Sequence, residues 1–439
     1  MPVTASAANH LTERRRGLVH AVGAAGLETT LAVAGLAVIG VHLVDDNFFQ
    51  PQPGTSAGDH LVSGLVPTAV LLTAAAAYPH LRAGLRAALA LSLGILGMVI
   101  GAGEAGYYTL QVGPSGDDYT GLLAIPAGAL LVGTGATTLW RTRRRDDSLP
   151  RRYLRRLLLL LAAAVVFVFV LFPLSLSYVF THVSRVKVPT ANLGAAHEQV
   201  AFTTSDGLKL RGWYVPSQNG AAVVAFPGRK GPQRQARMLV RHGYGVLLFD
   251  RRGEGESDGD PNAFGWAMDR DLKAAAAFLQ DRPDVEPNRI GGIGLSVGGE
   301  MFIQTAAETR AFKAVVSEGA GARSIRENLE KPRTLGGLQE LAVSAVLTAG
   351  TALFSNHVPP PNLKHLSARI APRSVFFIYA LHGTGGEEKQ LNPKYYAAAG
   401  EPKQIWEIPE ASHTGGITAR PAEYERRVIA FFDDALLKR

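Results

Sequence analysis

The chain has 439 residues, of which 47% are hydrophobic, 19% are charged and none is cysteine. This length exceeds that of one compact domain, and the lack of cysteine excludes disulfides, thiolate metal sites and cysteine nucleophiles. The net charge of +8 comes largely from arginines clustered beside apolar runs, which indicates membrane topology before nucleic-acid binding.

Long apolar runs fill the first part of the chain. Each can cross the roughly 30 Å hydrocarbon core of a bilayer as one helix. They lie at residues 18–44, 61–80, 85–110, 119–140 and 153–181. The composition changes near residue 183, so we predict a membrane domain of about five helices at 1–182 and a second domain at 183–439.

Arginines occupy alternate loops between these runs, as the positive-inside rule requires of cytoplasmic loops. The loops at 45–60 and 111–118 contain no Lys or Arg. We therefore expect an integral protein of the cytoplasmic membrane, with a cytoplasmic N-terminus and an extracytoplasmic second domain. The arginines are Arg14, Arg15 and Arg16, then Arg82 and Arg86, then Arg141, Arg143, Arg144, Arg145, Arg151, Arg152, Arg155 and Arg156.

Two carboxylates, Glu28 and Glu104, fall within the apolar runs. Ionisable groups inside a membrane are costly, which makes both functional candidates for a proton or ion pathway. The alternative is a protonated or hydrogen-bonded structural group. We favour this alternative, because there is no matching intramembrane Lys or Arg and no repeat of the broken-helix type.

The second domain alternates β-rich stretches with helical ones, which predicts an α/β fold with a mainly parallel sheet. Active groups then gather at the carboxyl ends of the strands. Strands are expected at 199–203, 208–215, 222–226, 246–250, 290–294, 314–318, 374–379 and 405–408, and helices at 232–242, 265–280, 298–309 and 421–437.

The most informative motif is Gly294-Leu295-Ser296-Val297-Gly298, which has the G-x-S-x-G spacing of a nucleophile elbow. Its glycines allow a strand to turn sharply into a helix with the serine exposed at the turn. A serine nucleophile needs a base, and that base needs an acid to fix its tautomer. His413 follows a predicted strand near the C-terminus and is the expected base.

Residues 198–437 resemble the α/β-hydrolases of the serine-esterase and oligopeptidase-like type. The resemblance is carried by residues 243–257, the elbow at 294–299, the acidic segment after Tyr379, and residues 412–416. It implies a triad in the order serine, acid, histidine. Relatives usually carry an aspartate in the acidic segment, whereas this chain has Glu387 and Glu388.

Three glutamates are therefore candidates for the acid. We favour Glu388 slightly over Glu387. Glu318, at the end of the strand after the elbow helix, is a further candidate, with a structural role beside Arg323 or Arg326 as the equal alternative.

The oxyanion hole is expected to combine the N–H of Val297 with one from the turn after Phe226. Proline at 227 has no N–H, so Arg229 is the expected second donor. Arg229 and Lys230 would also place two cations near the site, where a solvated pair is favoured over recognition of an anionic substrate.

Residues 321–372 lack clear strands and include an apolar, helical stretch at 338–354. This segment is a cap over the site, a helix resting on the bilayer, or a structural excursion. The sequence leaves the three open.

These patterns predict a membrane-anchored serine hydrolase that cleaves an ester, such as a lipid or acyl ester, outside the cytoplasmic membrane. A peptidase of the oligopeptidase-like type is one alternative, and a transport, sensor or scaffold protein with a non-catalytic hydrolase-like domain is the other. The expected partner is a small-molecule or lipid-like substrate. No cofactor, nucleic-acid or metal motif is present in the sequence, and oligomeric state is left open.

Overall fold

The structure is a computed structural model that describes residues 26–114, 116, 118–142, 148–183, 188–330 and 334–438. The chain divides into two compact units. The helical unit contains residues up to Pro51 together with Ala57–Val179, and the α/β unit contains Gln52–Ser56 and the chain from Phe180 onward. Arg14, Arg15, Arg16, Arg143, Arg144, Arg145 and the first eight residues of the first apolar run lie outside the described residues.

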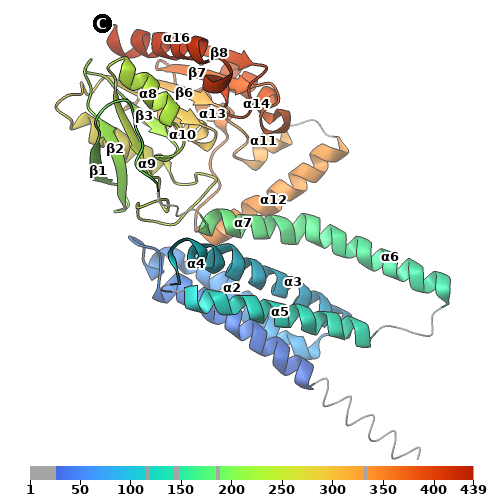
Figure 1. Cartoon of the computed structure of the whole chain (residues 1–439). Helices are drawn as coiled ribbons and strands as arrows, with labels where there is room; N and C mark the ends of the chain where they lie inside the picture. The colour runs from blue at the N-terminus through green and yellow to red at the C-terminus, as the bar shows by residue number, and fades with distance from the viewer. Residues whose placement is uncertain are drawn as a thin grey trace, which may run out of the picture. The chain divides into compact units, whose positions relative to one another are not determined.

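Long apolar helices build the helical unit (Figure 1). The helices long and apolar enough to cross a membrane in this part of the chain are Gly26–Phe49, Ala57–His80, Ala83–Gln111, Asp118–Arg141 and Leu149–His182. They contain α2 (Leu61–Ala77), α3 (Ala83–Ile100), η4 (Gly101–Ala105), α4 (Gly106–Val112), α5 (Asp118–Arg141), α6 (Leu149–Val166) and α7 (Phe172–His182).

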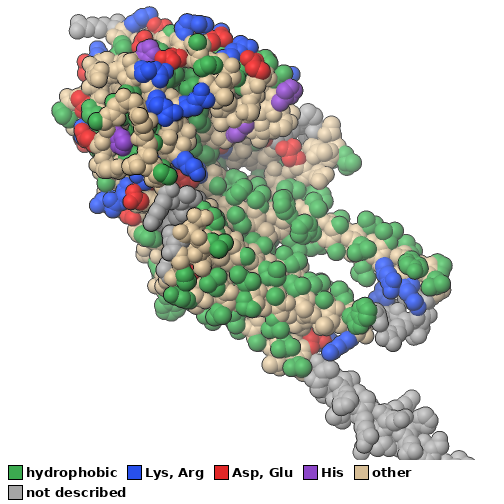
Figure 2. Space-filling view, in the orientation of Figure 1, with side chains coloured by type: hydrophobic (Ala, Val, Ile, Leu, Met, Phe, Trp, Pro, Cys, Tyr) green, Lys and Arg blue, Asp and Glu red, His purple; other side chains and the backbone are tan. Residues whose placement is uncertain are grey.

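Glycines bring α3 and α5 into close contact. A Cβ atom on Gly94 would lie 2.7 Å from the Gly128 carbonyl oxygen, and one on Gly128 would lie 2.5 Å from the Gly94 carbonyl oxygen. Small residues allow this approach in membrane helices. Leucines at 157–161 of α6 remain exposed, and apolar side chains cover much of this unit's visible surface (Figure 2).

An eight-stranded sheet forms the centre of the α/β unit. Its order is β1-β2-β4-β3-β5-β6-β7-β8, with β2 antiparallel to both neighbours and the remaining pairs parallel. This order is that of the α/β-hydrolase fold, which confirms the fold predicted from the sequence. The strands are β1 (Glu198–Thr203), β2 (Lys209–Val215), β3 (Ala222–Phe226), β4 (Gly245–Phe249), β5 (Ile290–Leu295), β6 (Ala314–Glu318), β7 (Ser374–Ala380) and β8 (Lys403–Ile408).

Helices cover both faces of this sheet (Figure 1). Because side chains alternate along a strand, Val224 packs into the core beneath one set of helices and Val223 into the core beneath the other. The first set is α9 (Asp269–Gln280), α10 (Val297–Glu308), α13 (Leu363–Ser367) and α14 (Glu387–Ala398); the second is α8 (Gln233–Arg241) and α16 (Pro421–Phe432).

The segment between β6 and β7 contains α11 (Ile325–Leu329) and α12 (Leu335–Ser355). By length and composition α12 is a sixth helix that is able to cross a membrane. However, β6 and β7 pair directly in one sheet, with Ala314 opposite Ser374 and Glu318 opposite Ile378. Since both ends of the segment return to the same sheet, one crossing by α12 would divide that sheet between the two sides. The topology therefore leaves five candidate spans in the part of the chain that the structure describes.

Candidate active site

Ser296 lies at the junction of β5 and α10. Its backbone has φ 53° and ψ −123°, a region that non-glycine residues rarely occupy and that is typical of a strained functional turn. The turn requires glycines on both sides. A Cβ atom on Gly294 would lie 2.3 Å from the carbonyl carbon of Gly298, and one on Gly298 would lie 2.6 Å from the Phe226 oxygen. The nucleophile elbow expected from the sequence is present.

His413 lies between Ser296 and Glu388. Its Nε2 is 2.9 Å from Ser296 Oγ, and its Nδ1 is 2.6 Å from Glu388 Oε1. Three side chains that are distant in the sequence therefore form one continuous chain of hydrogen bonds. The geometry is that of a serine–histidine–acid triad.

Glu388 is fully buried, and the Ala380 N–H donates to its second carboxylate oxygen at 2.9 Å. The hydrogen bond that His413 donates to Glu388 is the main cause that raises the pKa of His413 above its ordinary value, while burial acts in the opposite direction. A carboxylate in this position stabilises the imidazolium that forms during catalysis.

Glu387 is the first residue of α14, and Glu388 is the second. Neighbouring residues of a helix point about 100° apart. Glu388 therefore meets His413, whereas Glu387 is half-buried and lines a pocket. Of the two glutamates left open by the sequence, the structure brings only Glu388 to the histidine.

Glu318 is not beside His413 as its acid, and it does not pair with Arg323 or Arg326. Its carboxylate accepts hydrogen bonds from the Gly416 N–H at 2.8 Å and from the Tyr424 hydroxyl at 2.6 Å. Burial raises the pKa of Glu318. Its contacts anchor the loop that carries His413 to α16 and to the end of β6.

Val297 begins α10 and lines the pocket beside Ser296. The first N–H groups of a helix have no acceptor within it, so the Val297 N–H suits a developing oxyanion. Arg229 departs from the prediction. Its N–H donates to Asp250 Oδ1 at 3.3 Å, because the Arg229 side chain is buried in an ion pair with the same carboxylate. In this structure the Arg229 N–H is therefore not a free second donor.

Because of the same ion pair, Arg229 and Lys230 are not two solvated cations near the site. The Arg229 guanidinium contacts Asp250 and, at 3.0 Å, Glu256. It also lies 5.0 Å from the centre of the Trp213 ring. Arg229 is thus a neutralised structural residue, and only Lys230 of the pair is exposed.

A pocket of 460 Å³ opens beside Ser296. One wall is α12, which contributes residues at helical spacing: Glu340, Ser344, Leu347, Thr348 and Thr351. Helix α12 therefore lies beside the nucleophile, at the place that a cap would occupy. The remaining lining residues that argue for a polar pocket are Arg323, Ser324, Asn328, Thr384 and Glu387.

Two charged groups of this pocket were missed in the sequence. Glu300 lies one helical turn after Ser296 on α10, and the Arg323 Nε is 3.6 Å from its Oε2. Burial raises the pKa of Glu300 to about 7, although Arg323 acts in the opposite direction. The i, i+4 spacing of Ser296 and Glu300 is the signal that would have placed Glu300 on the nucleophile's side of α10.

Comparison with known proteins finds hydrolases among the similar families and proteins. The family model of X-Pro dipeptidyl-peptidases (S15 family) matches residues 184–365. An uncharacterized protein of Salmonella typhi, YfhR, is 28% identical over 260 residues, which are 55% of this chain and 83% of that protein. The thiohydrolase aneE of Aspergillus aculeatus is 33% identical over 132 residues, which are 28% of this chain and 41% of that protein.

Among solved structures, an esterase of Pyrococcus furiosus matches 58% of this chain and 98% of its own, with 24% identity and a TM-score of 0.47. The strand order, the elbow and the S15 match together place the α/β unit among the hydrolases.

Proposed function

We propose that this chain is a membrane-anchored serine hydrolase that cleaves a carboxylic ester through an acyl-enzyme. The observation that carries the proposal is the continuous contact from Ser296 through His413 to Glu388. Ser296 lines a pocket large enough for a small substrate.

In this mechanism Ser296 Oγ attacks the carbonyl carbon while His413 Nε2 takes the hydroxyl proton. The Val297 N–H donates to the oxyanion of the tetrahedral intermediate. His413 then gives its proton to the leaving alcohol oxygen as the ester bond breaks. Water, activated by the same nitrogen, releases the acid and restores Ser296.

A peptidase acting on a substrate with a free amino group is the second candidate. The S15 match favours it, and so do the carboxylates of Glu300 and Glu387, which line the pocket beside Ser296. Carboxylates in a partly buried pocket suit an ammonium group. An ester remains our first choice, because the chemistry of the triad serves both bonds and an ester is the easier of the two to cleave.

The nucleophile is tested with a fluorophosphonate probe on the full chain in detergent. We expect labelling of the wild type and of Ser374→Ala, at the far end of β7, and no labelling of Ser296→Ala. Equal labelling of Ser296→Ala would contradict the proposal, as would an unlabelled wild type.

The bond is tested with p-nitrophenyl esters of increasing acyl length and with Gly-Pro-p-nitroanilide. We expect turnover of short esters and none of the anilide. Anilide turnover that exceeds ester turnover, and that is lost in Ser296→Ala, would replace the esterase by the peptidase.

The five candidate spans support attachment to the cytoplasmic membrane, and the loop arginines favour an extracytoplasmic α/β unit. An alkaline phosphatase fused after the C-terminus should be active in intact cells. A silent fusion together with an active cytoplasmic reporter would reverse the orientation.

A further inference from the structure

His42, in the helix Gly26–Phe49 of the helical unit, is fully buried, yet its Nε2 has no hydrogen-bond partner. Buried polar atoms are normally paired, so an orphaned ring nitrogen calls for an explanation. The nearest charged atom is Glu104 Oε2, at 4.0 Å, and Glu104 is 2% exposed. A glycine makes room here, since a Cβ on Gly121 would lie 2.9 Å from His42 Cε1.

The tautomer of His42 follows from its other nitrogen. Thr120 Oγ1 donates its single proton to Asp45 Oδ2 at 2.8 Å. His42 Nδ1 lies 3.3 Å from the same hydroxyl oxygen, so this contact requires a proton on Nδ1. A neutral His42 then carries a lone pair on Nε2, directed toward Glu104.

Glu104 presents electron density to the same gap. The Tyr178 hydroxyl donates to Glu104 Oε2, which orients the carboxylate. A lone pair and a carboxylate thus face each other in a buried site, an arrangement that a positive species between them would stabilise.

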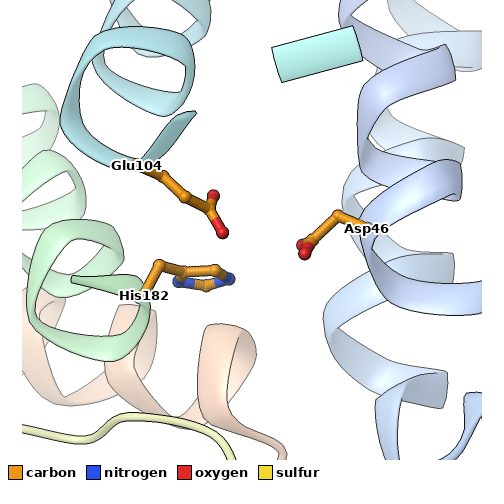
Figure 3. Close-up of side chains that lie close together, drawn as sticks. All are labelled: Asp46, Glu104 and His182. Carbon is orange, nitrogen blue, oxygen red and sulfur yellow. The ribbon is translucent and has the colours of Figure 1, made fainter. Parts of the chain in front are cut away.

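A second carboxylate completes the site. Asp46 follows His42 by four residues on one helix, a spacing that places both on the same face. A carboxylate oxygen of Asp46 lies within 4.8 Å of one of Glu104, and Figure 3 shows the two side chains extending toward each other from η1 (Asp45–Phe49) and η4. His182, also drawn there, belongs to the α/β unit and is not one of the proposed ligands.

We propose that His42, Glu104 and Asp46 bind a divalent transition-metal ion such as Zn²⁺ within the helical unit. Ligand atoms at 2.0–2.2 Å from an ion are at most about 4.2 Å apart, so the gap between His42 and Glu104 already fits one. Asp46, whose carboxylate lies within 4.8 Å of that of Glu104, is the proposed third ligand. Imidazole with two carboxylates suits zinc and its neighbours better than Ca²⁺ or Mg²⁺.

Outer contacts support the same assignment. Thr120 fixes the tautomer of His42, Tyr178 orients Glu104, and the Asn47 side-chain amide donates to Asp46 Oδ2 at 3.1 Å. Metal ligands are held by such partners, whose loss typically costs about 10- to 100-fold in affinity.

The test uses the full, untagged chain in detergent, stripped with EDTA, dialysed against Zn²⁺ and analysed for metal content. We expect about one equivalent in the wild type, and a visible absorption band when Co²⁺ replaces Zn²⁺. His42→Gln and Glu104→Gln should lose both signals. Glu28→Gln, a matched acid of the same unit that contacts Arg86 and Tyr78, should keep them.

Because a ligand variant is able to disturb folding, Thr120→Val provides a second test with all three ligands in place. It should weaken Zn²⁺ binding about 10- to 100-fold while the size-exclusion profile stays unchanged. A wild type without bound metal would mean that a proton on His42 fills the gap, and would overturn the proposal. Equal binding by the wild type and His42→Gln would also overturn it.

Discussion

The two units bury their polar groups in different ways. In the α/β unit, buried charges are paired: Arg252 contacts both Asp271 and Asp206, and Arg229 contacts Asp250. In the helical unit Glu28 shares Arg86 and Tyr78, but His42 has a ring nitrogen without a partner. Paired charges hold loops in place, whereas a fully buried ring nitrogen that faces a carboxylate without a hydrogen bond marks a position open to a further ligand.

The largest expected effect is a loss of catalysis in the α/β unit. Glu388→Gln removes the charge that orients His413, and we expect kcat to fall by about 10²- to 10⁴-fold. Glu387→Gln leaves the contact with His413 intact and should change kcat by less than about tenfold. Initial rates with a p-nitrophenyl ester measure both. A larger loss in Glu387→Gln would mean that the wrong glutamate has been assigned.

The second-largest effect is expected on stability, when a buried ion pair is broken. Asp271→Asn leaves the Arg252 guanidinium without its fully buried partner, and we expect a loss of about 3–5 kcal/mol in the free energy of unfolding. Tryptophan fluorescence reports it, since Trp213, Trp266 and Trp406 all lie in this unit.

A matched control for this variant is Arg270→Ala. Arg270 contacts Asp206 in the same cluster but is 46% exposed, so its loss should cost less than about 1 kcal/mol. Similar losses in the two variants would show that the cluster does not distinguish buried from exposed charge.

The pH dependence of activity is a smaller effect that sharpens the same comparison. Catalysis needs neutral His413, and Glu388 raises the pKa of His413 by stabilising its protonated form. Activity should therefore be lost as the pH falls through this raised pKa. In Glu388→Gln the acidic limb of kcat/KM should move to lower pH. A limb that stays in place would assign it to another group.

The smallest effect is expected from Glu28→Gln. Its contacts are long, 3.5 Å to Arg86 Nε and 3.4 Å to the Tyr78 hydroxyl, so the variant should lose about 1 kcal/mol or less. Thermal unfolding in detergent measures the change. A collapse of the helical unit in this variant would show that Glu28, and not only the His42 site, is critical there.

The sequence predicted what depends on local pattern. Strands at 222–226 and 314–318 match β3 and β6 residue for residue, and Ser296 and His413 meet as expected. What it left open depends on the direction in which a side chain points. The choice between Glu387 and Glu388 needed the start of α14, a helix that the pattern after β7 did not predict.

The sequence also did not show which residues that are distant in the chain contact each other. The sequence predicted a free Arg229 N–H. In the structure this group donates to Asp250, which lies 21 residues further along the chain. The sequence analysis assigned Arg86 to a cytoplasmic loop, whereas the structure places it in the first turn of α3, where it contacts Glu28. The proximity of His42 and Glu104 could not be predicted from spacing, because the two residues lie 62 positions apart on different helices.

The apolar cap helix α12 has a practical consequence for expression. Only Gly350, Thr351 and Ser355 of this helix are buried, while Leu335 and Leu338 are exposed. Removing the first 179 residues would therefore not yield a freely soluble enzyme. The shortened protein would behave as an amphiphile that aggregates without detergent, and its purification would require the same care as that of the complete chain.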